Sequence, residues 1–458
     1  MLTYRLELEP LNHWAQLEHR KPIVIRGARQ VGKSTLVKLL AEHQQLALLE
    51  LNFERTPELA ELFQSNDPVK IIDFLQIQFK CSVIPGKTLL FLDEIQATPQ
   101  ILTSLRYFYE EMPQLHVIAA GSLLDFALKN ATFSMPVGRL EYMYLGPLSF
   151  EGFLLAVEET QLYHFLVHYH LGDDFPSPIH QRLLELLKVY LIIGGMPEAV
   201  VTYAQTRDFA AVERVKHSIL NTYQDDFNKY APASSQFRLR QIFNKIAALV
   251  GHKLKYSHII DTEKSTVVAA ALEKLCLARV VYLVHHSACN GLPLGAQISE
   301  KIFKSLFLDV GLLSTNLGLN FLDLRSIQEL TLVNSGSVAE QFVGQHLLFS
   351  HPPYVEPKLY YWTREKKSAA AEIDYVMSQG LHIIPVEVKA GKTGSLKSLH
   401  YFLQEKHFKL GVKLNTQLPS LSFERNKLIH DGVIEYQLLS LPLYFVGQLS
   451  RLLEESCH

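Results

Sequence analysis

The chain has 458 residues, 48% of them hydrophobic, which is enough for about two to four domains with buried cores. Its 44 Lys and Arg residues nearly balance its 46 Asp and Glu residues. The formal net charge of -2 excludes a global signature of nucleic-acid binding, so any basic face must be local. The cysteines form no CxxC pair, and we expect reduced thiols in a cytoplasmic protein. The first residues carry no apolar signal segment and no apolar run is long enough to cross a bilayer, so no membrane partner is expected.

From residue 22 to about 150, short apolar runs alternate with helix-like segments. The runs are "PIVIRG", "LALLELN", "TLLFLDE" and "LHVIAAG", and each precedes a segment with helical character. Such alternation is typical of a parallel β-sheet with helices on both faces. We therefore predict an α/β domain over residues 1–150.

A phosphate-binding loop follows the first of these strands. "GARQVGKS" at 27–34 matches G-x-x-x-x-G-K-[ST] in full, with a strand before it and a helix after it. Glycines let backbone N–H groups curl around phosphates, Lys33 would reach the β- and γ-phosphates, and Ser34 would ligate Mg²⁺. A chance glycine loop is the alternative, and the flanking strand and helix count against it. The residues expected to contact ATP are Gly27, Ala28, Arg29, Gln30, Val31, Gly32, Lys33, Ser34 and Thr35.

"TLLFLDEIQ" at 88–96 supplies the second half of a nucleotide site. Asp93 emerges at the carboxyl end of a buried strand, where it can hold Mg²⁺ through water. Glu94 follows directly and is the natural base for an attacking water. Alone, this segment would be an ordinary buried strand that ends in a charged turn. Together with the phosphate-binding loop, it indicates ATP hydrolysis.

Two further polar residues are candidates for sensing the γ-phosphate. Ser122 follows the strand "LHVIAAG" and is equally well explained as a helix N-cap. Arg139 is a candidate arginine finger or sensor, acting in cis or in trans, and its alternative is a surface arginine.

The middle of the chain is predicted to be helical. Residues 151–235 form a helical lid or linker region with one marked break, "GGMPE" at 194–198. Residues 236–330 indicate a helix–turn–helix followed by strands that would form a wing. Lys253, Lys255, His258 and Lys264 add modest positive charge there. DNA binding and a purely structural winged-helix module both remain open, because the basic residues are few.

The last region, residues 331–458, contains two strand-like runs joined at Gln379-Gly380, which predicts a hairpin. Asp374 lies in the first run, and Glu387 and Lys389 lie in the second. These side chains would meet at one end of the hairpin, where a divalent metal that activates a water could bind.

Taken together, the motifs resemble a known family. "RGARQVGKSTL", "LLFLDEIQ", "AAGSLL" and "GRLEYMYLGPLSFEGF" are followed in order by "YLIIGGMPEAV", "KSLFLDVGLL", "EIDYV" and "VEVKAG". This series is similar to that of prokaryotic AAA-type P-loop ATPases whose C-terminal half is a domain of unknown function related to PD-(D/E)xK nucleases. The resemblance covers about residues 20–410.

The resemblance implies a nuclease-like C-terminal site. Glu340 fits the acidic position of its helix, Asp374 and Glu387 fit the ligands of Mg²⁺ or Mn²⁺, and Lys389 fits the residue that orients the attacking water. A nuclease-like fold kept for binding or assembly is the alternative.

The leading hypothesis is thus an ATP-hydrolysing, DNA-associated protein with ATP and DNA as partners and homo-oligomerisation left open. The rival is a nucleotide-gated signalling or scaffold ATPase whose C-terminal domain binds a protein.

Overall fold

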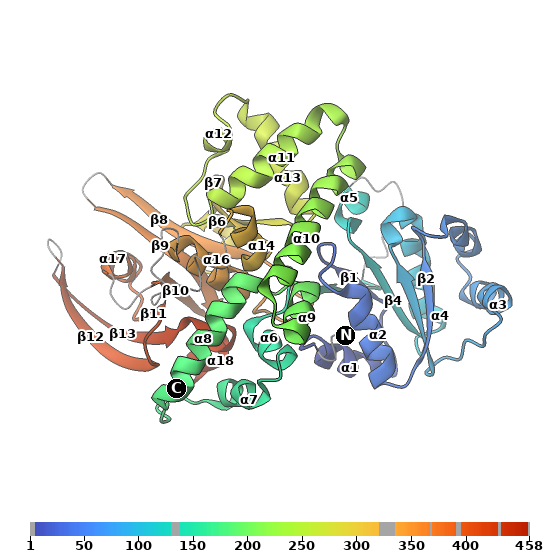
Figure 1. The fold of residues 1–458 in the computed structure, drawn as a ribbon, viewed down its shortest axis with the longest axis horizontal. Helices are drawn as coiled ribbons and strands as arrows, with labels where there is room; N and C mark the ends of the chain where they lie inside the picture. The colour runs from blue at the N-terminus through green and yellow to red at the C-terminus, as the bar shows by residue number, and fades with distance from the viewer. Residues whose placement is uncertain are drawn as a thin grey trace. The chain divides into compact units, whose positions relative to one another are not determined.

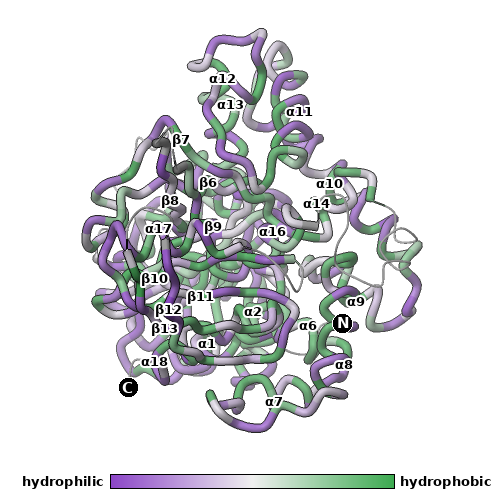
Figure 2. The backbone as a smooth tube through the Cα atoms, turned by 90° about the vertical axis from the view of Figure 1, so that its left-hand side faces the viewer, coloured by the Kyte–Doolittle hydropathy of each residue, from purple (hydrophilic) through white to green (hydrophobic). Residues whose placement is uncertain are grey.

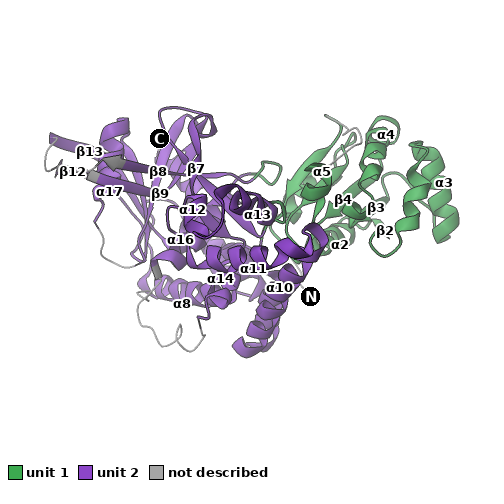
Figure 3. Cartoon of the chain, turned by 90° about the horizontal axis from the view of Figure 1, so that it is seen from above, with its two compact units in different colours: residues 1–146, 277–279, 352–356 green, residues 147–276, 280–351, 357–458 purple. Residues whose placement is uncertain are grey.

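The computed structural model divides the chain into two compact units (Figure 3). The first comprises residues 1–146 with the segments 277–279 and 352–356, and the second comprises the rest. The residues that the structure describes are 5–129, 138–319, 335–366, 369–390, 395–428 and 432–456. Among these, no helix has the length and apolar character needed to span a membrane.

The first unit contains a parallel sheet that has five strands within the described residues, in the order β2-β3-β4-β1-β5. Its strands are β1 (Ile23–Arg26), β2 (Ala47–Asn52), β3 (Thr88–Asp93), β4 (His116–Gly121) and β5 (Glu141–Tyr144). The four strands predicted from apolar runs are β1 to β4, so the predicted parallel α/β sheet is confirmed. β5 was not predicted, because it is short and only one of its four residues is buried.

Helices cover both faces of this sheet. Leu90 and Leu92 of β3 pack in one core cluster with side chains of the helices that follow β2 and β3. The alternate residues Leu89 and Phe91 are also fully buried, and α2 packs against β2, β3 and β4. Burial on both faces explains why β3 and β4 are continuous apolar runs. The helices are α1 (Leu8–Ala15), α2 (Lys33–His43), α3 (Pro68–Phe79), α4 (Leu105–Glu111) and α5 (Leu124–Lys129), with 3-10 turns at Pro57–Phe63, Ile95–Ala97 and Pro99–Ser104.

The second unit is built on a mixed sheet that has eight strands within the described residues, in the order β12-β13-β11-β10-β9-β8-β6-β7 (Figure 1). The strands are β6 (Val281–Ser287), β7 (Ile298–Phe307), β8 (Leu359–Lys366), β9 (Ala369–Gln379), β10 (His382–Val388), β11 (Leu410–Asn415), β12 (Ser420–Leu428) and β13 (Gly432–Pro442). β9 and β10 are antiparallel neighbours joined at Gly380-Leu381, so the predicted hairpin is present.

Helices make up most of the remainder of this unit. They are α6 (Phe150–Ala156), α7 (Thr160–His168), α8 (Ser177–Ile193), α9 (Pro197–Thr206), α10 (Phe209–Tyr230), α11 (Ala233–Ala248), α12 (Tyr256–Ile259), α13 (Ser265–Leu277), α14 (Val310–Asn316), α16 (Ser335–Leu348), α17 (Lys397–Lys406) and α18 (Leu449–Ser456). Along α11, hydrophobic and hydrophilic residues intermingle (Figure 2), and its buried face includes Leu239, Ile242 and Phe243. This pattern is the one expected of a helix with a single packed face.

The helix–turn–helix predicted in the middle of the chain corresponds to α11, α12 and α13. The strands expected to form its wing, β6 and β7, pair with each other, and β6 also pairs in parallel with β8. β6 and β7 therefore extend the sheet that contains β9 and β10, and the winged helix stays a prediction. All segments after residue 146, apart from the two short ones named above, belong to one unit. The boundaries at 235 and 330 remain predictions, and residues 320–334 lie outside the described part.

The break at "GGMPE" is explained by tight packing between α8 and α14. The Asp309 carboxylate accepts hydrogen bonds from the Gly195 N–H (2.6 Å) and the Leu312 N–H (3.0 Å), and it thereby also caps α14. The Leu148 N–H donates to the Gly195 carbonyl (2.7 Å). Gly194 has φ 77°, in the left-handed region that favours glycine. The motifs "GGMPE" and "FLDVGLL" thus lie together in the core of the second unit.

Candidate functional sites

The phosphate-binding loop lies between β1 and α2, as the motif predicts. Gln30 and Gly32 have φ of 64° and 90°, so the backbone turns back on itself before α2 begins at Lys33. The Lys33 ammonium is buried and donates to the carbonyls of Gly27 (3.0 Å) and Ala28 (2.8 Å). Lys33 therefore folds over the loop at the place where phosphate oxygens would be bound.

Lys33 has an unusual ionisation equilibrium. Burial lowers its pKa to about 8, against the opposing influence of Glu94 and Asp93, which raise the pKa. A poorly solvated ammonium that donates to two backbone carbonyls gains strongly from a phosphate anion. This environment suits a residue whose partner is the nucleotide.

Ser34 and Asp93 meet at the edge of the sheet, as expected of a Mg²⁺ site. The Ser34 hydroxyl donates to Asp93 Oδ2 (3.1 Å). Asp93 is buried at the end of β3, and burial raises its pKa, with Glu94 adding to the effect. A hydroxyl and a carboxylate are hard oxygen ligands of the kind Mg²⁺ prefers. The residues present therefore fit Mg²⁺ bound to ATP.

Glu94 and Ser122 are also brought together. Glu94 Oε2 accepts hydrogen bonds from Gln96 Nε2 (2.6 Å) and from the Ser122 hydroxyl (3.4 Å). Glu94 has φ 52°, a left-handed conformation that is costly for a residue with a Cβ and that recurs at functional sites. Sequence reasoning missed Gln96, although it belongs to the "LLFLDEIQ" motif.

Three of the other residues predicted to contact ATP, Ala28, Arg29 and Val31, belong to the loop itself, whereas Arg139 lies outside it. Ala28 and Val31 are buried, while Arg29 forms an ion pair with Glu54 (3.6 Å). Arg139 lies in an exposed ion pair with Glu110 of α4 (2.9 Å). Its role as arginine finger or surface residue stays a prediction.

A pair of arginines near the nucleotide site was missed by sequence reasoning. Asp125 of α5 binds Arg26 (3.2 Å), the last residue of β1, and Arg279 (2.6 Å) from the segment 277–279 of the first unit. Arg279 also stacks on Tyr144 at 5.0 Å and is close enough to Lys33 to lower its pKa. No sequence signal indicates this contact, because Arg279 lies more than a hundred residues from the motifs it joins.

The C-terminal candidates come together in the second unit. Tyr375 of β9 and Val386 of β10 form the last residue pair at the open end of the hairpin, and Asp374 and Glu387 are their next neighbours along the two strands. Asp374 Oδ2 accepts a hydrogen bond from the Val388 N–H (2.8 Å). Glu340 lies on α16, whose backbone is tied to β9 by the Tyr375 hydroxyl (2.8 Å to the Glu340 carbonyl).

Lys389, just beyond β10, pairs with Glu387. The Lys389 ammonium donates to Glu387 Oε1 (2.5 Å), while no described residue donates to the buried Glu387 Oε2. Burial raises the pKa of Glu387 to about 7, with Asp374 adding to it. Burial, then Asp374, likewise raises the pKa of Glu340 to about 8. Lys389 alone therefore does not balance the three carboxylates of Glu340, Asp374 and Glu387.

A second lysine, missed by sequence reasoning, occupies the centre of this group. The Lys304 ammonium of β7 contacts Glu372 Oε1 (2.6 Å), Glu340 Oε2 (3.4 Å) and Asp374 Oδ1 (3.5 Å), and only 2% of its side chain is exposed. Lys304 begins the "KSLFLDVGLL" motif, so a signal existed, but nothing in the sequence assigned it a role. We call Lys304, Glu340, Glu372, Asp374, Glu387 and Lys389 the lysine–carboxylate cluster.

The cluster as it stands does not fit a divalent metal. Within the described ranges, no group of three or more His, Cys, Asp and Glu side chains is arranged to hold a metal ion. Lys304 already engages Asp374, one of the two predicted metal ligands, and Glu340, the predicted acidic residue of the helix. The metal-ligand roles of Asp374 and Glu387 therefore remain predictions that require Lys304 to move.

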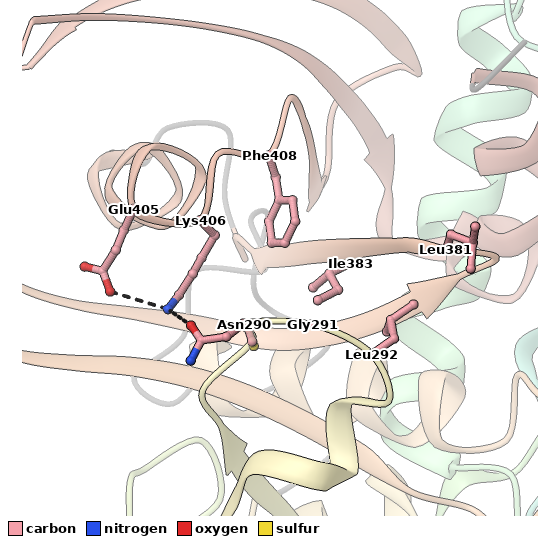
Figure 4. Close-up of a pocket in the computed structure, with 9 residues that line it drawn as sticks. Asn290, Gly291, Leu292, Leu381, Ile383, Glu405, Lys406 and Phe408 are labelled. Carbon is pink, nitrogen blue, oxygen red and sulfur yellow. Dashed lines mark hydrogen bonds and ion pairs between the residues drawn. The ribbon is translucent and has the colours of Figure 1, made fainter.

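A cavity of about 260 Å³ lies elsewhere in the second unit, at the turn between β9 and β10 (Figure 4). Its lining includes the apolar side chains of Ile383 and Phe408 and the Lys406 ammonium, which donates to Asn290 Oδ1 (2.7 Å). None of the residues predicted to be functional lines it.

These features define a P-loop NTPase domain: a phosphate-binding loop, the Ser34–Asp93 pair and Glu94 lie together at the edge of a parallel sheet. Residues 19–154 match a family described as an AAA domain, so the chain carries an AAA-type ATPase domain. Residues 184–323 match a domain of unknown function (DUF8612), and residues 335–432 match another (DUF4143). No match was found among curated proteins.

Solved structures show weak similarity. The structure of C. elegans PCH-2 has 14% identity and a TM-score of 0.29, covering 46% of this chain and 69% of its own. The Aeropyrum pernix ORC2 protein, in ADPNP and ADP complexes, has 12% identity and a TM-score of 0.33, covering 71% of this chain and 96% of its own. At these values, neither similarity carries an argument about function.

Proposed function

We propose that the protein is an ATP-hydrolysing switch that associates with DNA through its second unit. The observation that carries the ATPase part is the meeting of Lys33, Ser34, Asp93 and Glu94 at one edge of the parallel sheet. Bound Mg²⁺ would neutralise charge on the phosphates.

Each predicted residue of the nucleotide site has a defined task in this proposal. Lys33 exchanges the carbonyls of Gly27 and Ala28 for β- and γ-phosphate oxygens. Glu94 accepts the proton of the attacking water, and Ser122, bonded to Glu94, orients that carboxylate. Arg139 stays a proposed arginine finger or sensor, in cis or within a homo-oligomer.

The DNA-binding part rests on the helix–turn–helix of α11, α12 and α13 and on the lysines around it. Lys255 and Lys264 are exposed, and Lys253 is half-buried. In winged-helix proteins, the helix reads the groove and basic side chains hold phosphates. The local charge is modest, so we expect binding that depends strongly on salt.

Reversing the charge of Lys253, Lys255 and Lys264 together is expected to weaken DNA binding. Each lost phosphate contact should reduce the slope of log affinity against log salt by about one unit. The slope is measured by fluorescence anisotropy with labelled duplex at several salt concentrations. The matched control reverses three exposed cations on other elements of the same unit, Lys409, Arg425 and Lys427. Equal affinity of both triple variants and the parent protein would leave the helix–turn–helix as a packing module.

A second candidate function is DNA cleavage by the C-terminal domain. The observation that favours it is the juxtaposition of Glu340, Asp374, Glu387 and Lys389 around one hairpin end. For metal-dependent cleavage, Lys304 would have to move away from Glu340 and Asp374 so that a metal ion could bind there. Without cleavage, the same domain would serve to bind DNA or a protein partner.

If this candidate is right, Mg²⁺ or Mn²⁺ should support cutting of duplex, branched or single-stranded DNA, with or without ATP. Asp374→Ala and Lys389→Ala should each abolish cutting while ATP hydrolysis continues at the parent rate, which excludes general unfolding. Products are separated on denaturing gels. Intact DNA in every combination of substrate and ion would rule the nuclease candidate out and favour the partner-binding alternative.

A further inference from the structure

The lysine–carboxylate cluster contains a cation of its own. Lys304 is almost fully buried, although β7 is the edge strand of the described sheet and is bridged at the neighbouring Phe303 by Leu254. Its ammonium touches three carboxylates that come from α16 and β9, so elements distant in sequence converge on one positive charge. The ring of Tyr361 lies 5.6 Å from it and adds a further favourable contact.

The electrostatics of Lys304 show that these contacts hold its charge in place. Burial alone would lower its pKa, as it does for isolated lysines in protein interiors. Glu340, Asp374 and Glu372 outweigh this and raise the pKa well above its usual value. The three ion-pair contacts of Lys304 thus give these carboxylates a counter-ion that belongs to the chain itself.

We infer that Lys304 is the resident cation of the lysine–carboxylate cluster and fills the place that a divalent metal would otherwise occupy. The ammonium compensates carboxylates that would repel one another if the group were left open. Glu387, whose Oε2 is buried without a described partner, is joined to this group through the backbone, because the N–H of the next residue, Val388, donates to Asp374 Oδ2 (2.8 Å). The domain consequently folds without metal, and a divalent ion must compete with Lys304 for Glu340 and Asp374.

The inference predicts that removing the lysine charge creates a metal requirement. Lys304→Met keeps the length of the side chain and removes the ammonium, so the buried carboxylates lose their counter-ion. Without nucleotide and in EDTA, the variant should unfold at a lower temperature than the parent protein. Adding Mn²⁺, Mg²⁺ or Ca²⁺ should then raise its unfolding temperature, because only the folded state offers the vacated cluster. The parent protein should respond little to any of the three ions.

Calorimetric titration with Mn²⁺ gives the second measurement. Lys304→Met should bind Mn²⁺ about tenfold tighter or more than the parent protein, comparable to the effect of one neighbouring charge on an ionisation equilibrium. The matched control is Lys301→Met, an exposed lysine on the same strand, which should behave as the parent protein does. It also reports any effect of the ions at the ATPase site.

A charge-compensated variant keeps the inference testable if Lys304→Met fails to fold. Lys304→Met combined with Glu372→Gln removes one positive and one negative charge, and should recover stability in EDTA relative to the single variant. Two results would overturn the inference. One is Mn²⁺ binding by the parent protein as tight as by Lys304→Met. The other is destabilisation of Lys304→Met that neither the ions nor the second substitution relieves. Neither result depends on whether DNA is cut.

Discussion

Glu94→Gln is expected to bind ATP with nearly parent affinity and to hydrolyse it about 100- to 10,000-fold more slowly. The carboxamide keeps the shape of the side chain and still reaches Ser122, but it cannot accept the proton of the attacking water. Lys33→Ala should act earlier in the cycle. It removes the buried ammonium that would contact the phosphates, so both ATP binding and turnover should be lost.

These outcomes separate binding from chemistry when two quantities are measured on the same preparations. Nucleotide affinity comes from titration with a fluorescent ATP analogue, and turnover comes from phosphate release. Glu111→Gln, an exposed carboxylate of α4 in the same unit, is the matched control and should be unaffected in binding. If Glu94→Gln hydrolyses ATP at the parent rate, Glu94 is not the base.

Gly195→Ala is expected to destabilise the second unit by about 3 kcal/mol, the upper part of the usual range for overpacking. A Cβ at this position would overlap the Leu148 carbonyl and would lie 2.7 Å from the Tyr190 hydroxyl. The carbonyl belongs to backbone that is itself hydrogen-bonded to Gly195, so it cannot rotate away. The bond from the Gly195 N–H to Asp309 would be strained as well.

The measurement is thermal unfolding of the full chain, where this loss corresponds to a fall of roughly 6–12 °C in the transition of the second unit. Gly336→Ala is the control. A Cβ there meets nothing within 4 Å, and alanine is the better helix former in α16. A parent-like transition for Gly195→Ala would mean that the contact of Gly195 with Leu148 and Tyr190 tolerates more volume than its distances allow.

The local sequence by itself determined the elements whose signals are short-range. β1, β3 and β4 were predicted because burial makes each a continuous apolar run, and β2 was predicted from the short apolar run that precedes Asn52, although it is only half-buried at the edge of the sheet. The phosphate-binding loop was predicted because its glycines, Lys33 and Ser34 are adjacent in the chain. The β9–β10 hairpin was predicted for the same reason, since its turn and its two strands are contiguous.

Only the tertiary structure decided which distant side chains share an environment. Lys304 reaches Asp374 across 70 residues, and Arg279 reaches Asp125 across 154, so no spacing in the sequence could reveal either pair. Asp309 meets Gly195 because α8 and α14 pack without room for a Cβ, a constraint that arises from the fold. The sequence therefore allowed the acidic residues and Lys389 to be predicted as parts of a metal site. Their counter-ion, however, was determined by long-range packing, since charge balance depends on which groups are close in space.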